Sequence, residues 1–275
     1  MTDEPGDLME TARLLAREAG DFIAAQRSSV RVAHTKSSEV DVVTEVDLAC
    51  EALLRQRIAH LRPGDGILGE EGDDVPGTSG ITWVLDPIDG TVNYLYGLPN
   101  YAVSVAAVAG PPRTRDWTAV AGAVYDGLGT MWSAARGEGA WRDRTRLVRH
   151  DGPGSLATAL IGTGFQYVAA RRAVQGRLVA QLLPQVRDIR RQGAAAVDLC
   201  LVAAGHLDAY YEHGLHAWDL AAGALIAREA GMRVGGLGDE PPTEELTIAA
   251  HPAVWDELRE ALIAAGARDL FAGID

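Results

Sequence analysis

The chain has 275 residues, of which 47% are hydrophobic, and a formal net charge of −13. A chain of this length and composition can bury a substantial core. Its acidic charge argues against a protein that binds nucleic acid or an anionic membrane surface.

The N-terminal segment is acidic, without the basic and apolar regions of a signal peptide, and no uninterrupted apolar span of about 18 residues occurs in the sequence. We therefore expect a soluble cytoplasmic protein that does not enter a membrane. The two cysteines, Cys50 and Cys200, lie in apolar helical patterns. This context predicts buried thiols rather than a disulfide framework.

Residues 1–150 are expected to form a helix pair and a mainly antiparallel sheet. Leu8, Leu15 and Ile23 recur at helical spacing and mark the apolar side of the first helix. Gly110, Pro111 and Pro112 predict a hairpin-like break. The expected helices lie near residues 6–28 and 44–60, and the expected strands near 66–69, 81–85, 101–109 and 117–125.

Residues 151–275 alternate strands with helices, which predicts a more parallel sheet. The expected strands lie near 156–161, 187–190, 207–212 and 245–249, and the expected helices near 169–182, 194–204, 218–230 and 252–265. The Gly- and Pro-rich stretch 235–242 predicts a surface loop. Candidate site residues occur in both halves, so we expect one catalytic unit of mixed α/β (α+β) class over residues 1–275.

The most informative segment is 81–91, an apolar run followed by two carboxylates and a Gly-Thr pair. Asp86 lies where the predicted strand ends, and Pro87 is expected to end the ladder because it has no N–H to donate. This would leave the Ile88 carbonyl free to point at a ligand. The alternative is a strand followed by an Asx turn, which Asp-Pro and Asp-Gly pairs often form.

Asp89, Gly90 and Thr91 resemble the start of a helix, where unpaired N–H groups and the helix dipole favour an anion. Carboxylates for hard cations would therefore lie beside a cradle for phosphate. This combination suggests metal-assisted phosphoryl transfer to water.

Further acids flank this segment. Glu70 follows a short apolar strand and could complete a coordination sphere with Asp86 and the Ile88 carbonyl, although adjacent glutamates on a surface turn are common. Asp219 precedes the helical pattern 220–231, where its alternative role is a simple helix N-cap.

Taken together, these motifs resemble the inositol monophosphatase family of magnesium-dependent, lithium-sensitive phosphatases. The matching stretches occur in the family's order and span most of the chain: 36–47, 69–71, 83–94, 193–200, 208–212 and 218–219. The resemblance implies a layered α-β-α-β-α sandwich and a homodimer. Several separate motifs in agreement are far more specific than any one of them.

The resemblance also implies two or three Mg²⁺ ions. Glu70, Asp86 and the Ile88 carbonyl would bind one ion, and Asp86, Asp89 and Asp219 would bind a second. Asp86 would then bridge the two cations, an arrangement that stabilises in-line displacement at phosphorus. A further, weaker ion would lie near Glu70.

Three residues are catalytic candidates under the resemblance: Glu70, Thr91 and Asp47. The attacking water would lie near Glu70 and be oriented by Thr91, with Asp47 behind the threonine hydroxyl. Asp47 also fits an ordinary helical position, because Thr44 can cap the helix that carries it. Both interpretations can hold together.

The implied substrate contacts separate into two groups. Gly90 and Thr91 would donate N–H groups to the phosphate. The leaving group would lie near the residues Asp89, Ala195 (through its backbone), Glu212 and Asp219. An ionised carboxylate only accepts hydrogen bonds, which suits the hydroxyl groups of a polyol. A loop that in the family closes over the metals carries Lys36, Asp41 and Thr44.

The expected activity is hydrolysis of inositol 1-phosphate. Alternative substrates within the superfamily are fructose 1,6-bisphosphate, histidinol phosphate, adenosine 3′,5′-bisphosphate and NADP. Outside the enzyme class, some relatives are associated with transcription or ribosome function, so a binding role with residual catalysis is a second hypothesis.

Other features carry weaker hypotheses. His213 and His216 could be zinc ligands, but Gly214 between them weakens a helical arrangement. The segment with Arg142, Arg144, Arg146 and Arg149 could touch an anionic partner, although a charged, solvated strand edge is favoured. Tyr96 and Glu39 depart from the residues common in the family, which affects loop details and substrate preference.

Overall fold

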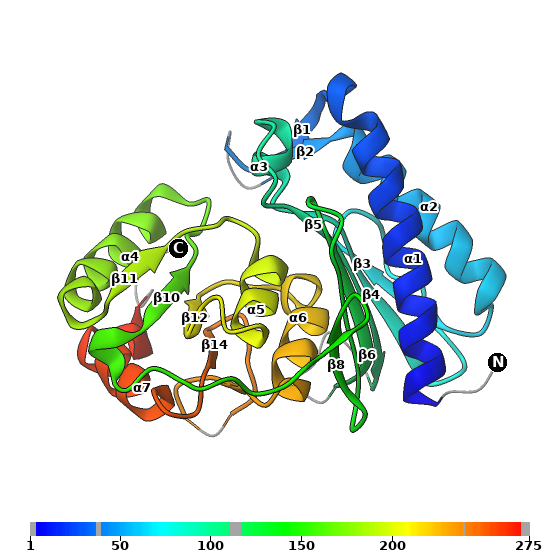
Figure 1. Cartoon of the computed structure of the whole chain (residues 1–275). Helices are drawn as coiled ribbons and strands as arrows, with labels where there is room; N and C mark the ends of the chain where they lie inside the picture. Colours follow the sequence, from blue (N-terminus) through cyan, green and yellow to red (C-terminus); the bar gives the residue numbers. More distant parts are fainter. Residues whose placement is uncertain (1–3, 37–39, 111–116, 239, 271–275) are drawn as a thin grey trace.

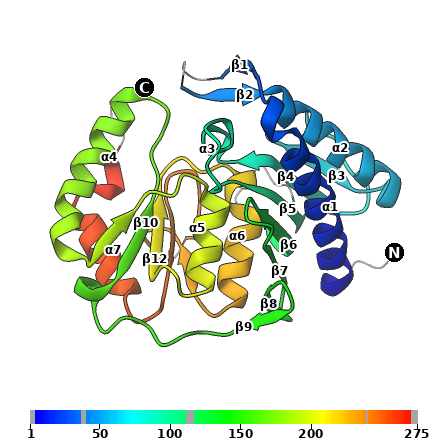
Figure 2. The same ribbon diagram turned by 45° about the horizontal axis from the view of Figure 1, so that its top comes forward.

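A computed structural model of the chain describes residues 4–36, 40–110, 117–238 and 240–270. Helices and sheets alternate in five layers, so the expected α-β-α-β-α sandwich is confirmed (Figure 1). In order, the layers are the pair α1 and α2, a seven-stranded sheet, the pair α5 and α6, a five-stranded sheet, and the pair α4 and α7 (Figure 2).

The seven-stranded sheet follows the chain order, with β3 parallel to β4 and every later pair antiparallel. Its strands are β3 (Gly66–Gly69), β4 (Ile81–Asp89), β5 (Ala102–Ala109), β6 (Thr118–Asp126), β7 (Met131–Ala135), β8 (Gly139–Arg142) and β9 (Thr145–Leu147). A separate antiparallel pair is formed by β1 (Val32–Thr35) and β2 (Val42–Thr44).

The five-stranded sheet has the order β11-β10-β12-β14-β13. Its strands are β10 (Leu160–Thr163), β11 (Asp188–Arg190), β12 (Ala209–Glu212), β13 (Arg233–Gly235) and β14 (Thr247–Ala250). The expected parallel character holds for β11, β10 and β12, whereas β14 is antiparallel to both of its neighbours.

Helices α1 (Pro5–Gln26) and α2 (Glu45–Leu61) cover the outer face of the seven-stranded sheet. Leu8, Leu15 and Ile23 on α1 are each at most 1% exposed, as their helical spacing predicts. The helix approaches the sheet closely at Gly20, where a Cβ atom would lie 2.0 Å from a ring carbon of Tyr125. Glycine is therefore required at this crossing.

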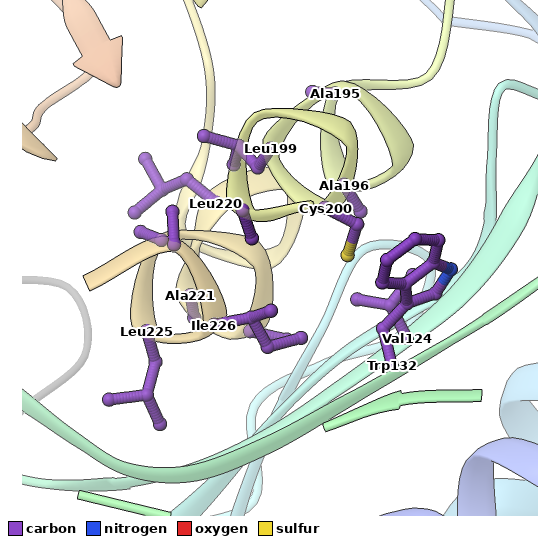
Figure 3. Close-up of a cluster of buried hydrophobic side chains, with 14 of the residues drawn as sticks. Val124, Trp132, Ala195, Ala196, Leu199, Cys200, Leu220, Ala221, Leu225 and Ile226 are labelled. Atoms are coloured by element: carbon purple, nitrogen blue, oxygen red, sulfur yellow. The ribbon is translucent and has the colours of Figure 1, made fainter. Parts of the chain in front are cut away.

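The central helix layer consists of α5 (Ala195–Ala203) and α6 (Ala217–Glu229), which pack between the two sheets. Both helices are rich in small and apolar residues because both faces are buried. Cys200 on α5 directs its sulfur toward Val124 and Trp132 of the first sheet (Figure 3). Cys50 and Cys200 are free and buried, which confirms their predicted role as core residues.

The outer layer against the five-stranded sheet consists of α4 (Ala169–Leu182) and α7 (Trp255–Ala264). The remaining helix, α3 (Thr91–Leu95), follows β4 directly. Among the described residues, no helix is both long enough and apolar enough to span a membrane.

Several predicted boundaries are wrong. The strand expected at 81–85 continues to Asp89, because Pro87 falls at an irregularity rather than at the strand end. The strand expected at 156–161 is a 3-10 turn at Leu156–Thr158 followed by β10. The loop expected at 235–242 begins inside β13. Pro111, Pro112 and Glu39 lie outside the described residues.

Candidate active site

An irregularity in β4 shapes the centre of the site. Asp86 pairs with Ser104 of β5 and Asp89 with Ala102, so β4 holds one extra residue over this span. The Ile88 N–H donates to Asp86 Oδ1 (3.0 Å), and the Ile88 carbonyl accepts from the Thr91 hydroxyl (2.9 Å). The backbone thus turns back on itself immediately after Asp86. At Gly90 the turn requires a φ of +85°, which glycine adopts without strain.

Three carboxylates meet at this turn. Asp86, Asp89 and Asp219 each offer an oxygen atom within 4.8 Å of the others, and this group could hold a metal ion. Asp86 and Asp89 come from β4, whereas Asp219 lies in the first turn of α6, in the second half of the chain. The site is therefore assembled from both halves.

Backbone N–H groups hold two of these carboxylates in place. Asp89 accepts from Ala195 N (3.2 Å) and Ala196 N (2.7 Å) at the start of α5. Asp219 accepts from His216 N (2.7 Å) in a capping box, so it occupies the third helical position rather than the N-cap itself. The backbone around Ala195 was expected near the leaving group, and in this arrangement its N–H is directed at Asp89.

The electrostatics of the cluster favour a bound cation. Burial raises the pKa of Asp86 well above its ordinary value, and the charges of neighbouring carboxylates raise it further. Burial also raises the pKa of Asp219, and raises that of Asp89 to about 7. Crowded, buried carboxylate oxygens match the ligands that hard divalent cations prefer. The residues present therefore fit a metal site.

Glu70 extends the acidic cluster from the end of β3. Its carboxylate lies close enough to Asp86 for its charge to raise the pKa of Asp86, and it forms an ion pair with Lys36 (Oε1 to Nζ, 2.7 Å). The same ammonium group lies 2.8 Å from Glu71 Oε1. Burial lowers the pKa of Lys36, but its two carboxylate partners outweigh this effect and leave the pKa raised. Lys36 is therefore a positively charged side chain beside Glu70 and Glu71.

Asp47 lies behind Thr91. It completes the capping box of α2, in which Asp47 Oδ2 accepts from Thr44 N (2.9 Å) and Asp47 N donates to Thr44 Oγ1 (3.3 Å). The Thr91 hydroxyl lies 3.2 Å from Asp47 Oδ1. Asp47 is completely buried, and burial raises its pKa to about 6. The predicted capping by Thr44 is confirmed, together with the contact to Thr91.

Glu212 is the last residue of β12. It accepts a hydrogen bond from the Tyr210 hydroxyl, and burial raises its pKa to about 7. Arg191 lies near enough for its positive charge to lower that pKa in part. The charges of Arg191, Asp41, Asp89 and Glu70 also act on the Tyr167 phenol, whose pKa is raised mainly by partial removal from water, although the residue is 37% exposed.

Sequence reasoning missed Arg191 and Tyr167. Both lie in irregular segments outside the helices and strands, where neither periodicity nor a recognisable motif marks a residue as facing the site. Asp198 was part of a matching motif, but its complete burial near Glu212 and Asp89 could not be inferred.

The contacts of the two histidines give the zinc hypothesis no support. His213 is 3% exposed and contacts the Ala267 carbonyl (3.4 Å), whereas His216 pairs with Glu244 (3.0 Å) and its ring lies 4.8 Å from that of Trp218. The side chains therefore have separate surroundings. The φ of +87° at Gly214 places a turn between them.

The arginine segment forms β8 and the edge strand β9, as the solvated-edge interpretation predicts. Arg142 and Arg146 are exposed and lie over the rings of Trp132 and Trp141, at 4.9 and 5.8 Å from the ring centres. Tyr96, a departure from the family, is 77% exposed at the end of α3.

The layered fold and the acidic cluster at the end of β4 define a phosphatase class that depends on metal ions. The chain belongs to the inositol monophosphatase family, whose model matches residues 5–268.

Relatives and solved structures agree with this assignment. The inositol-1-monophosphatase SuhB of Mycobacterium tuberculosis is 48% identical over 286 aligned residues, which cover 94% of each chain. The solved structure of M. tuberculosis SuhB matches with a TM-score of 0.81 at 47% identity and covers 97% of this chain and 100% of its own. A Xylella fastidiosa relative named Nus factor SuhB is 36% identical over 262 residues, with 91% and 92% of the two chains covered.

Proposed function

We propose that this protein is a Mg²⁺-dependent phosphomonoesterase that hydrolyses inositol 1-phosphate to inositol and phosphate. The observation that carries the proposal is the convergence of Asp86, Asp89 and Asp219 within 4.8 Å, beside a turn that leads into α3. Membership in the inositol monophosphatase family supports the reaction class and a phosphorylated substrate.

For the metals, we propose that Glu70, Asp86 and the Ile88 carbonyl hold one Mg²⁺, and that Asp86, Asp89 and Asp219 hold a second. A third, weaker ion would lie near Glu70. When bound, the ions would polarise the phosphate oxygens and raise the acidity of a water molecule. The charge of Glu70 raises the pKa of Asp86, and the closeness of the two carboxylates that this effect requires supports a shared site.

For the chemistry, the proposed roles of Glu70, Thr91 and Asp47 follow from their contacts. The Thr91 hydroxyl has a single proton and two acceptors within reach, the Ile88 carbonyl (2.9 Å) and Asp47 Oδ1 (3.2 Å). We propose that it donates to Asp47 when the Ile88 carbonyl binds a metal, so that its lone pairs can accept from the attacking water. A buried Asp47 with a pKa of about 6 is suited to take up a proton near neutral pH. Glu70 would hold the water on its other side, and the Gly90 and Thr91 N–H groups would bind the phosphate.

For the leaving group, we propose contacts with Asp89, Ala195, Glu212 and Asp219. Glu212 approaches the site from β12 and already accepts from the Tyr210 hydroxyl, which fixes its orientation. The remaining acceptor sites of its carboxylate would be available to the hydroxyl groups of inositol.

Because Asp219 and Glu212 come from the second half of the chain, we propose that residues 1–275 work as one catalytic unit. We further propose a homodimer, as the family resemblance implies. Sedimentation equilibrium of the purified protein, with and without Mg²⁺, should give a mass of twice 29.2 kDa. A single species of monomer mass under both conditions would contradict the dimer.

The substrate is tested by kcat/KM values for a panel of phosphomonoesters at saturating Mg²⁺. The panel contains inositol 1-phosphate, fructose 1,6-bisphosphate, histidinol phosphate, adenosine 3′,5′-bisphosphate and NADP. Inositol 1-phosphate should have the highest value. If another member of the panel had a kcat/KM value ten times higher, the protein would still be a phosphatase, but the proposed substrate would be wrong.

A second candidate function follows from the X. fastidiosa relative that is named a Nus factor. Under this hypothesis the chain would bind the transcription machinery and retain residual phosphatase activity. The enzyme is favoured here, because a pure scaffold has no physical need for buried carboxylates that repel one another without metal.

A further inference from the structure

Glu51 is a buried carboxylate outside the proposed ligand and substrate set. It lies on α2, is 2% exposed, and faces the turn that follows β3. Glu51 Oε2 accepts from Glu71 N (2.8 Å), and Glu51 Oε1 accepts from Gly72 N (2.8 Å). Arg55, one helical turn further on, donates from Nε to Glu51 Oε1 (2.7 Å). The charge of Glu51 is therefore balanced within a well-defined set of donors.

The backbone on both sides of Glu70 is fixed by these contacts. Glu70 N donates to the Leu85 carbonyl of β4 (3.2 Å), and the next N–H, that of Glu71, donates to Glu51. With both flanking peptide groups anchored, the direction of the Glu70 Cα–Cβ bond is set. Only the side-chain torsions remain for Glu70 to adjust.

The turn fits closely around Glu51. A Cβ atom at position 69 would lie 2.5 Å from the Glu51 carboxylate, and one at position 72 would lie 2.9 Å from Glu51 Oε1. The glycines that bracket the acidic pair thus make room for this carboxylate. Arg55 extends the attachment by donating from Nη1 to the Asp73 carbonyl (2.8 Å).

We propose that Glu51 is a positioning residue that holds the turn 69–73 so that Glu70 faces Asp86 before a cation binds. The inference rests on the metal site proposed above. Asp86 is buried and Glu70 lies half-buried beside it, so bringing the two carboxylates together without a cation is unfavourable. An unanchored turn would let Glu70 move toward solvent, where its side chain is already 21% exposed. The hydrogen bonds that Glu51 accepts from Glu71 N and Gly72 N oppose this movement and so strengthen metal binding.

The direct test is Mn²⁺ binding to metal-free protein, followed by electron paramagnetic resonance, for wild type and Glu51→Gln. The amide cannot accept both N–H groups of the turn, because one of its two polar atoms is a donor. We expect at least one Mn²⁺ site to weaken by about 10–100-fold, the range found when groups that orient metal ligands are replaced. The Mg²⁺ concentration for half-maximal phosphatase activity should rise in parallel, while KM for the phosphomonoester at saturating Mg²⁺ should change less than about twofold.

Glu45→Gln is the matched control, because it removes the same charge from an exposed position on the same helix. Its Mn²⁺ affinity should equal that of wild type. Arg55→Lys is the second variant if Glu51→Gln does not fold. Arg55→Lys keeps the Glu51 carboxylate and the positive charge at position 55, but it loses the guanidinium group that donates to both Glu51 and the Asp73 carbonyl. This variant should weaken Mn²⁺ binding by about 2–5-fold.

A lower melting temperature with unchanged Mn²⁺ affinity in a folded Glu51→Gln or Arg55→Lys protein would show a merely structural role and overturn the proposal. Weaker Mn²⁺ binding in a protein that hydrolyses no member of the phosphomonoester panel would support the positioning role of Glu51 and reject the proposed function. Wild-type protein that binds no Mn²⁺ would overturn both.

Discussion

Replacing Asp86 by asparagine should abolish turnover and at the same time stabilise the metal-free protein. Asp86 is the ligand shared by both proposed Mg²⁺ ions, so its loss weakens both sites. The substitution is otherwise conservative, because an asparagine Oδ1 can still accept from Ile88 N, which lies 3.0 Å from the present oxygen. The fold should remain intact.

The size of the stabilisation follows from the geometry of the cluster. Two unit charges 4.8 Å apart repel by roughly 3 kcal/mol at an effective dielectric constant of about 20. The raised pKa of Asp86 means that part of this repulsion is already relieved by protonation, so a net gain of about 2 kcal/mol is reasonable. For a chain of 275 residues the melting temperature should rise by about 3–4 °C.

The assay compares thermal unfolding after treatment with EDTA and phosphate release at saturating Mg²⁺. Asp126→Asn is the control, because Asp126 is a buried aspartate outside the cluster that accepts from Leu128 N, Thr130 N and the Trp132 indole N–H. It should lower the melting temperature and leave activity per folded molecule unchanged. Near wild-type activity of Asp86→Asn at millimolar Mg²⁺ would refute the bridging role, and a lower metal-free melting temperature would refute the repulsion argument.

Three further outcomes are expected. Millimolar Li⁺ should inhibit at fixed Mg²⁺, on the hypothesis that it replaces the more weakly held ion at the aspartate cluster; unchanged rates across the titration would contradict this. Glu212→Gln should lower kcat/KM for inositol 1-phosphate more than for glycerol 2-phosphate, whereas Thr91→Ala should lower kcat for both by roughly 10²–10⁴; equal losses for Glu212→Gln would make that residue structural. Because the pKa of buried Asp47 is about 6 and its ionised form must accept from Thr91, kcat at saturating Mg²⁺ should fall as the pH drops below about 6. Asp47→Asn should show a lower rate without this acidic limb, and an unchanged limb in that variant would assign the titration to another group.

Helices and site residues could be predicted where the sequence shows a strong periodic pattern or a known motif. The first helix was expected at 6–28 and is found at Pro5–Gln26, because its apolar residues recur on one face and bury together. Asp86, Asp89 and Asp219 could be singled out as one group because their motifs matched those of a known family. The structure brings them together.

Short strands were predictable only in part. The spaced arginines predicted a charged strand edge where β8 and β9 lie but not the bounds of either strand, and β7 has no clear alternation of polar and apolar residues. They form because each pairs with a neighbour already in the sheet. Pro87 misled in the same way, since the irregularity in β4 places it where no ladder hydrogen bond is needed.

Contacts made across the chain were also hidden. In the sequence, Glu51 looks like an ordinary polar residue of a helix. Only the tertiary structure shows that it accepts from Glu71 N and Gly72 N. Arg191 and Tyr167 lie in irregular segments, where no helical or strand period applies. Periodicity contains no information about such contacts.

The central claim is that the acidic cluster at the end of β4 holds divalent cations required for phosphomonoester hydrolysis. The most direct measurement is phosphate release from inositol 1-phosphate by EDTA-treated protein, titrated with Mg²⁺, for wild type and Asp219→Asn. Wild type should be inactive without Mg²⁺ and reach a saturable rate at millimolar Mg²⁺, and Asp219→Asn should remain inactive or need far more Mg²⁺. Full activity in EDTA, or an Asp219→Asn titration that matches wild type, would contradict the account.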